Sequence, residues 1–333
     1  MDHDTWLAQV IEDPIEPEMP IIDPHHHLWD YPKSRYMVDD LLADTGSGHR
    51  IVQTVFVECL SQYRLDGPTE MRPVGETEFV RHITEPQIKK GSGATRVAAG
   101  IVGFADLTLG TVVRPVLEAH IDAGDGRFRG IRHAVSWVDS EQINNAHTHP
   151  PRGLLLDSRF REGFACLKTY DLSFDAWLYH PQIPELTDLA RAFPDTRIIL
   201  DHVGGVLGIG PFAGQREQVF AQWQKDMAQL AQCENVTVKL GGLGMKLCGF
   251  DWHRQPTPPT SEDLARAFGP YITSCIDTFG VGRCMFESNF PVDKPSCAYT
   301  VLWNAFKRIT SDLSIDERTA LFHDNAARIY RLD

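Results

Sequence analysis

Three consecutive histidines end an apolar stretch near the start of this 333-residue chain, within Pro20 to Asp30, P-I-I-D-P-H-H-H-L-W-D. Side chains alternate between the two faces of an extended strand, so His25 and His27 share one face and His26 points to the other. Two neutral imidazoles that project together from a strand can hold a zinc-like cation or contact an anionic substrate. This spacing predicts part of a site whose other members come from elsewhere in the fold.

Further apolar stretches end in polar residues, and they alternate with amphipathic stretches. The predicted strands end near His27, Glu58, Gly103, His133, His180, His202, Leu240 and Asn289. The predicted helices include Thr77 to Ile83, Val113 to Ala123, Ile183 to Phe193, Gln215 to Cys233 and Ser261 to Thr278. Strands that alternate with helices are typical of a parallel sheet. Eight such units without a linker predict one domain over residues 1–333, an α/β (β/α)8 barrel with its active site at the carboxyl ends of the strands.

Two longer segments, Val138 to Pro151 and Lys246 to Pro259, follow strands on the predicted active-site side. Loops in this position commonly close over a site or select its substrate. His147 and His149 lie in the first of them, next to prolines, and we expect both side chains to be solvated.

The composition limits the choice of partners. Lys and Arg total 32 against 45 for Asp and Glu, and the formal charge of -13 argues against a nucleic acid or an anionic membrane surface. Seven cysteines without a C-x-x-C pair predict neither a disulfide framework nor a cysteine zinc site. The acidic amino-terminal stretch lacks the features of a signal peptide, and no apolar run reaches the roughly 18 residues that span a bilayer. We expect a cytoplasmic protein with a small-molecule substrate. The composition does not decide whether the protein forms a homo-oligomer.

Several motifs, taken in order, resemble one known group of proteins. They are D-P-H-H-H-L-W-D, G-I-R-H, L-D-H-V-G-G, V-K-L-G-G-L, F-E-S-N-F-P-V-D and N-A-A-R-I-Y. Together they resemble the amidohydrolase superfamily, and within it the lactonase-like branch of the amidohydrolase-2 relatives, which includes sugar-acid lactonases and 2-pyrone-4,6-dicarboxylate lactonase relatives. The resemblance implies a distorted barrel that hydrolyses lactones, sometimes with one zinc ion and sometimes without a metal.

The resemblance also assigns ligands. The first-strand histidines of the family fall on His25 and His27, and its sixth-strand histidine falls on His202. A fifth-strand histidine, here His180, is a zinc ligand in related decarboxylases. If a metal is bound, we therefore expect one divalent ion, such as zinc, at these four imidazoles.

Two further residues are expected to contact substrate, together with His180. The strand-four arginine, which grips carboxylate or hydroxyl groups in similar proteins, falls on Arg132. Its guanidinium is always cationic and can form a forked contact. Glu58, at the end of the second strand, could bind a substrate hydroxyl or form a structural salt bridge.

One position departs from the family pattern. Lactonase-like relatives usually carry an aspartate at the end of the eighth strand, where this chain has Asn289. An amide cannot transfer the proton between the attacking water and the leaving group. We expect Asp293, four residues further on, to replace it. Glu287, one layer deeper on the same strand, and a histidine are the alternatives.

The leading hypothesis is therefore a hydrolase that attacks a lactone or related carbonyl of a small, anionic or polyhydroxylated substrate with water. A cation at the imidazoles would polarise the carbonyl. In a metal-free version the imidazoles would donate hydrogen bonds to the developing oxyanion. The alternatives are a zinc-dependent non-oxidative decarboxylase, which His180 favours, and a non-catalytic ligand-binding barrel.

Overall fold

The computed structural model describes residues 2–89 and 95–332. Eight strands form one parallel sheet in the order β1, β4, β5, β6, β7, β8, β9, β10. Their bounds are β1 (Pro20–His26), β4 (Arg50–Val57), β5 (Arg96–Gly103), β6 (Phe128–Ile131), β7 (Ser173–Ala176), β8 (Ile198–Leu200), β9 (Val236–Leu240) and β10 (Cys284–Phe286). Buried residues fill both faces of these strands, as expected where helices cover a parallel sheet.

The sheet closes between its first and last strands. A parallel bridge joins His26 to Phe290, just beyond β10. The Asn289 N–H donates to the His25 carbonyl at 3.0 Å, and the His27 N–H donates to the Phe290 carbonyl at 2.9 Å. The predicted (β/α)8 barrel is therefore confirmed, and its closure brings the end of β1 next to the segment that follows β10.

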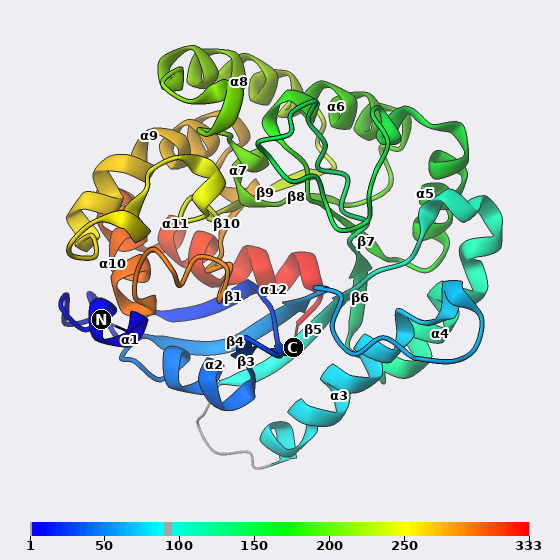
Figure 1. Cartoon of the computed structure of the whole chain (residues 1–333), viewed down its shortest axis with the longest axis horizontal. Coiled ribbons are helices and arrows are strands. Elements are labelled where there is room, and N and C mark those ends of the chain that lie inside the picture. Colours follow the sequence, from blue (N-terminus) through cyan, green and yellow to red (C-terminus); the bar gives the residue numbers. More distant parts are fainter. Residues whose placement is uncertain (1, 90–94, 333) are drawn as a thin grey trace.

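Helices surround the barrel (Figure 1). The α-helices are α1 (His3–Leu7), α2 (Val38–Thr45), α3 (Val74–Lys89), α4 (Arg114–Gly124), α5 (Ser158–Thr169), α6 (Ile183–Ala192), α7 (His202–Gly205), α8 (Arg216–Leu230), α9 (Ser261–Phe279), α10 (Tyr299–Ile309), α11 (Ile315–Thr319) and α12 (Asn325–Tyr330). Short 3-10 helices are η1 (Thr69–Met71), η2 (Leu107–Val113), η3 (Leu154–Leu156), η4 (His180–Gln182), η5 (Gly210–Phe212), η6 (Lys246–Cys248), η7 (Trp252–Arg254) and η8 (Val281–Arg283), and a π-helical turn, η9, spans Ala320–Asp324.

The last helix, α12, lies across the ring of strands in Figure 1. Its Ala326, Ile329 and Tyr330 pack against apolar residues of several strands, namely Ile22, Val55, Val57, Val102, Ile199 and Met285. This packing fills the interior of the barrel from the side opposite the histidines, so α12 forms a floor beneath the site.

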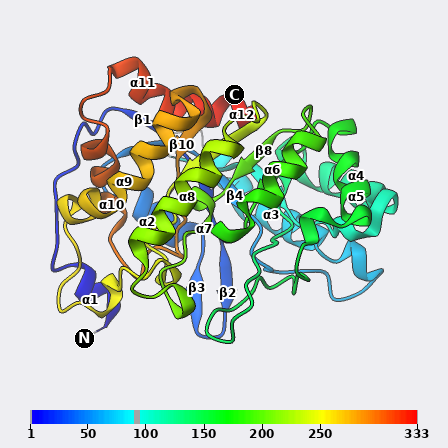
Figure 2. The ribbon, with the colours of Figure 1, turned by 90° about the horizontal axis from the view of Figure 1, so that it is seen from above.

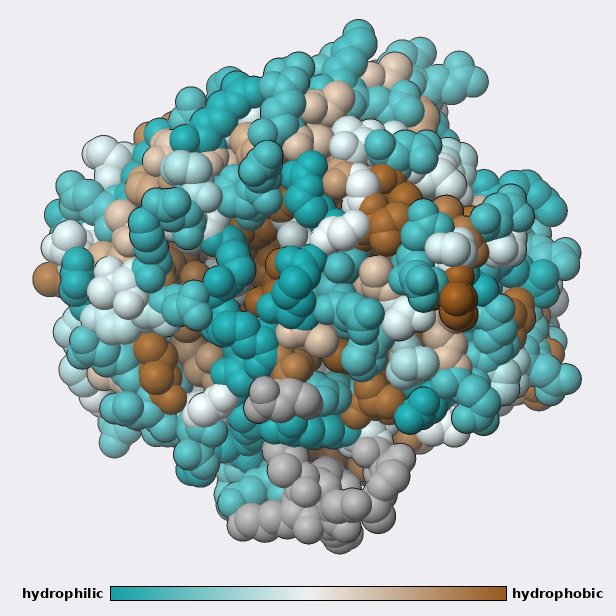
Figure 3. Space-filling view, turned by 180° about the vertical axis from the view of Figure 1, so that it is seen from behind, coloured by the Kyte–Doolittle hydropathy of each residue, from teal (hydrophilic) through white to brown (hydrophobic). Residues whose placement is uncertain are grey.

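The hairpin of β2 (Trp29–Tyr31) and β3 (Ser34–Tyr36) follows β1 directly. In Figure 2 it projects from the barrel on the side away from α12. On the face opposite that of Figure 1, hydrophilic residues predominate and hydrophobic ones form small scattered groups (Figure 3). Within residues 2–89 and 95–332, no helix combines the length and apolar character that crossing a membrane requires.

Candidate active site

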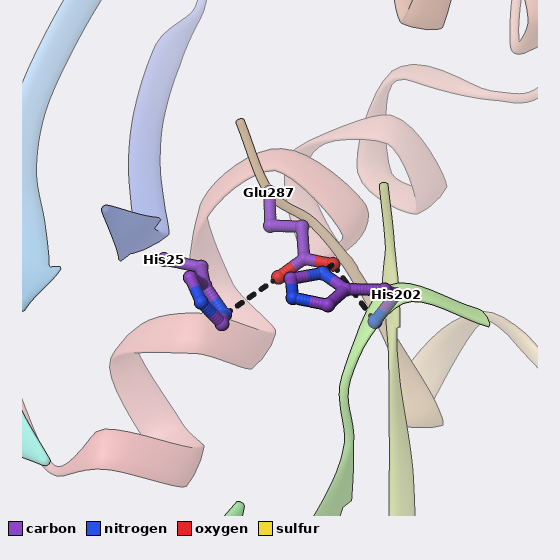
Figure 4. A group of neighbouring side chains, drawn as sticks. All are labelled: His25, His202 and Glu287. Atoms are coloured by element: carbon purple, nitrogen blue, oxygen red, sulfur yellow. Dashed lines mark hydrogen bonds and ion pairs between the residues drawn. The ribbon is translucent and has the colours of Figure 1, made fainter. Parts of the chain in front are cut away.

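Glu287 lies between two imidazoles at the centre of the site (Figure 4). Its Oε1 accepts a hydrogen bond from His202 Nδ1 at 2.6 Å and another from the His202 N–H at 3.0 Å. Its Oε2 lies 2.9 Å from His25 Nδ1. Burial alone would raise the pKa of Glu287, but His202 and His25 lower it to about 2. The carboxylate is therefore ionised and fixes the orientation of both rings.

A buried ion network lies beneath His25. Lys239 Nζ lies 3.1 Å from His25 Nδ1, 2.8 Å from Asp175 Oδ2 and 3.0 Å from Asp201 Oδ1. Tyr330 on α12 donates to Asp175 Oδ2 at 2.5 Å. All three ionic side chains are fully buried. Burial, and then the charge of Lys239, hold the pKa of His25 well below its usual value, so His25 is neutral at pH 7.

Arg132 is committed to the protein rather than to an open cavity. Its Nε donates to Glu58 Oε1 at 2.8 Å, and its Nη2 donates to the Glu58 carbonyl. Burial would raise the pKa of Glu58, but Arg132 and then His147 lower it to about 2. His147 Nε2 lies 3.2 Å from Glu58 Oε2, with 31% of its side chain exposed. The predicted solvation of His147 is therefore only partly correct, because the ring also contacts a buried carboxylate.

Asp293, which is expected from the sequence to transfer the proton, lies beside Asn289. Its Oδ1 accepts from Asn289 Nδ2 at 2.8 Å, and its Oδ2 accepts from the Gly244 N–H at 2.8 Å. The side chain is 1% exposed. Burial raises its pKa to about 7, against the lowering effects of His202 and of these two donors. A carboxyl with such a pKa can both take up and return a proton near neutral pH.

Glycines after β9 make room for these side chains. A Cβ on Gly241 would lie 2.5 Å from Glu287 Cγ, and one on Gly244 would lie 2.7 Å from Asp293 Oδ2. A Cβ on Gly242 would lie 2.4 Å from His202 Cβ. The glycine-rich sequence that follows β9 is thus required by close approach to the site.

His202 stands at the start of a left-handed turn. Its φ is 56° and that of Val203 is 46°, followed by positive φ values at Gly204 and Gly205. Non-glycine residues rarely adopt this conformation, and a β-branched residue is strained in it. The turn directs the His202 ring back towards Glu287 immediately after the short strand β8.

The described residues contain one group of metal-ligand types in close proximity: His25, His202 and Glu287, with ligand atoms within 4.8 Å of one another. Two imidazoles and one carboxylate form a ligand set that suits a catalytic divalent ion such as zinc. His202 Nδ1 is hydrogen-bonded to Glu287, so Nε2 is the ring nitrogen of His202 that could coordinate a cation. The residues therefore fit a divalent cation.

Comparison with known proteins agrees with this architecture. The profile of the amidohydrolase family matches residues 22–332. This chain belongs to the amidohydrolase family.

Several known proteins are similar to this amidohydrolase over most of its length. An uncharacterized protein of Sinorhizobium fredii is 36% identical, covering 95% of this chain and 99% of that protein. The L-fucono-1,5-lactonase of Burkholderia ambifaria is 28% identical, and the match covers 81% of this chain and 87% of that protein. A Burkholderia multivorans amidohydrolase, crystallised with bound zinc, shares the fold, with a TM-score of 0.72 at 24% identity over 94% of this chain and 99% of that chain. Family and relatives confirm the predicted resemblance and show that the chain is a hydrolase.

The amidohydrolase brings together only part of the predicted histidine set. His25 and His202 converge on Glu287, and the His27 ring lies 5.0 Å from the His25 ring, centre to centre. His27 Nδ1 is 2.8 Å from the Val57 carbonyl, and His27 stays outside the close ligand group. The carbonyl requires a proton on Nδ1, so the neutral ring has its lone pair on Nε2.

His180 requires a correction. The strand β7 ends at Ala176, and His180 begins the 3-10 helix η4 four residues later. Its Nδ1 accepts the Leu207 N–H at 3.2 Å, and its ring packs against Phe212. The apolar sequence before His180 resembles a strand, but in the structure this segment leaves the sheet. His180 therefore lies outside the ligand group of the amidohydrolase and has a structural partner.

Four buried charged residues at the candidate site of the amidohydrolase have a weaker signal in the sequence. Glu287 was an alternative base but instead orients two imidazoles from below. Asp175, Asp201 and Lys239 lie within or directly after apolar strands. Charged residues are almost never fully buried unless they are paired, so a charge inside each apolar stretch is the signal that could have identified them.

Proposed function

We propose that this amidohydrolase hydrolyses a lactone of a sugar acid. The observation that carries the proposal is Asp293, a buried carboxyl held by two hydrogen-bond donors with a pKa near 7. It replaces the ionisable group that Asn289 lacks. The lactonases of Burkholderia ambifaria and Burkholderia multivorans, which are 28% and 25% identical to this chain, support a lactone as the substrate.

In the proposed reaction, ionised Asp293 takes a proton from the water that attacks the lactone carbonyl. The new carbon–oxygen bond gives a tetrahedral oxyanion. When the bond from this carbon to the ring oxygen breaks, Asp293 returns the proton to the leaving oxygen. The product is an open hydroxy acid, which ionises and releases a proton at neutral pH. A pKa near the working pH suits a group that acts first as base and then as acid.

The hydrogen bonds of the imidazoles favour metal-assisted hydrolysis over hydrolysis in which the imidazoles themselves donate to the oxyanion. Because His27 donates through Nδ1 to the Val57 carbonyl, its neutral ring has no N–H left for an oxyanion, and the Nδ1–H of His202 is already used by Glu287. His25, His202 and Glu287 would hold a divalent ion, which when bound supplies a Lewis acid for the carbonyl. The protein's own contribution is to orient the ligands and to exclude water around them.

The decarboxylase alternative depended on His180 as a ligand. Since His180 lies in η4 with the Leu207 N–H as its partner, no specific observation now favours that reaction. The non-catalytic alternative depended on the loss of the acid-base residue, and Asp293 supplies such a group beside Asn289.

Elemental analysis of the purified protein, followed by a pH-indicator screen, tests the proposal. The screen contains aldonolactones, for which proton release is measured, and aromatic acids, for which carbon dioxide release is measured. We expect about one divalent ion per chain and proton release from an aldonolactone. Carbon dioxide release without lactone turnover would contradict the proposed function.

A further inference from the structure

The cations of the site are all committed to protein carboxylates. The Arg132 fork contacts the Glu58 side chain and carbonyl, and its remaining Nη1 lies 3.4 Å from His25 Nε2 and 3.7 Å from Asp201 Oδ2. Lys239 lies between Asp175 and Asp201. Neither cation can turn to a substrate carboxylate without leaving a buried carboxylate unpaired.

Carboxylates outnumber cations in this part of the structure. Among the described residues, the buried carboxyl groups of the site include Glu58, Asp175, Asp201, Glu287 and Asp293, whereas its buried cations are Arg132 and Lys239. Even a divalent ion at His25, His202 and Glu287 would not make the site positive. A charged carboxylate that enters such a buried site loses its hydration and gains no free counter-charge. This charge balance favours an uncharged substrate over an anionic one.

Glu58 still offers one acceptor. Glu58 Oε2 is buried and, among the described residues, accepts no hydrogen bond, although His147 Nε2 lies 3.2 Å away. The Glu58 oxygen can accept a hydrogen bond, and the imidazole of His147 beside it can donate one, so the pair places an acceptor and a donor side by side. A hydroxyl group needs both, because it donates one hydrogen bond and accepts others.

The segment around His147 is held in place by the protein. The Ala146 N–H donates to the Ser136 carbonyl at 2.9 Å, and Thr148 Oγ1 donates to the Ala134 carbonyl at 2.5 Å. Tyr179 donates to the Asn144 carbonyl at 2.5 Å. His147 is therefore positioned from both sides. It is far more exposed than Glu58 and Arg132, so it lies between the buried site and solvent.

We propose that His147 and Glu58 together bind a ring hydroxyl of an uncharged lactone, which makes His147 a specificity-determining residue of this enzyme. The inference rests on the proposed lactone hydrolase function and goes beyond it. It names the class of substrate and the group that recognises it.

Kinetics with His147→Ala and His147→Gln test the inference on two substrates, a neutral aldonolactone and δ-valerolactone, which has no ring hydroxyl. We expect His147→Ala to raise KM for the aldonolactone about tenfold, the effect of losing one hydrogen bond, with kcat within about threefold. His147→Gln keeps a donor and should restore part of the affinity. Neither variant should change the KM for δ-valerolactone.

His149→Asn is the matched control. His149 is exposed on the same segment with a φ of 50°, which asparagine tolerates. This variant should behave as wild type on both substrates. Wild-type enzyme should also prefer the neutral aldonolactone by at least about tenfold in kcat/KM over a lactone that carries a carboxylate.

The possible contrary results separate the two proposals. Wild-type turnover of aldonolactone with an unchanged KM in His147→Ala overturns this inference alone. An equal loss on both lactones indicates a structural role and also overturns it, as does a preference for the carboxylated lactone. Wild-type protein that hydrolyses neither lactone overturns the proposed function, and this inference with it.

Discussion

At the scale of single residues, the proposed reaction divides two roles between Asn289, which donates a hydrogen bond, and Asp293, which transfers the proton. Asn289 adopts a left-handed conformation, φ 56°, which asparagine accepts readily, and its amide donates to Asp293. Asp293 reaches the site from the following turn, where the Gly244 N–H fixes its second oxygen. The proposed proton-transfer group therefore lies four residues further along the chain than Asn289 but in direct contact with it.

Replacing Asn289 with aspartate tests this division. In Asn289→Asp a second carboxylate would lie at the 2.8 Å contact with Asp293, and the pair could not ionise fully near neutral pH. We expect kcat/KM at pH 7 to fall about tenfold or more and the ascending part of the pH profile to move to higher pH. A variant more active than wild type at pH 7 would show that position 289 is the base position.

Asp293 also predicts a change in stability. Its folded pKa of about 7 exceeds the usual 3.8, so the folded chain holds this proton more tightly than the unfolded chain does. Stability should therefore decline as pH rises from about 4 through about 7. Asp293→Asn cannot ionise and should gain about 1–3 kcal/mol relative to wild type above pH 7, with no gain at pH 4. Chemical denaturation at both pH values measures this, and an equal change at both would contradict it.

At the scale of elements, the segment after β9 shows how tightly the backbone approaches the site. Glycines at 241, 242 and 244 each leave space that a methyl group would take from Glu287, His202 or Asp293. The segment after β9 therefore sets the positions of side chains that come from the segments after β8 and after β10.

Gly244→Ala tests this packing. Its new methyl group would displace Asp293, so we expect kcat/KM to fall about tenfold or more while the chain still folds. Gly282→Ala is the control, because a Cβ there would meet no atom within 4 Å. Loss of activity in the control as well, or full activity in Gly244→Ala, would contradict the interpretation.

The sequence was sufficient to predict most of the elements but not every contact. Strand ends at positions 58, 103, 240 and 289 lie within three residues of the observed ends of β4, β5, β9 and β10, because apolar stretches and strands coincide there. The β7 end was placed four residues late, since an apolar segment that leaves the sheet has the same composition as a strand. The contacts of Arg132 and Lys239 depend on which carboxylates face them across the barrel. The alternation of side chains along a single strand does not predict which residues of other strands these are.

At the scale of the whole molecule, the first strand of the barrel and the last helix pack against each other near the site. The first strand carries His25, and the last helix, α12, closes the barrel beneath it. Tyr330 connects this floor to the ion network through Asp175 and Lys239. The helix α12 therefore supports the candidate site as well as the barrel.

Tyr330→Phe tests this support. Loss of the hydroxyl leaves Asp175 Oδ2 with one partner fewer, and we expect a loss of about 1–2 kcal/mol and a Tm lower by about 2–6 °C. The activity should fall several-fold, since Lys239 also contacts His25. Tyr170→Phe, which removes a surface hydrogen bond to Glu118, should leave both quantities nearly unchanged. If both variants behave alike, the network has no special role.

The pH dependence of kcat/KM for an aldonolactone, in wild type and in Asp293→Asn, measures whether Asp293 transfers the proton. If Asp293 transfers the proton, wild-type kcat/KM should rise with pH and level off above about 7. Asp293→Asn should lose this dependence and fall about 10²–10⁴-fold. Wild-type rates in Asp293→Asn, with the same pH profile, would contradict the account.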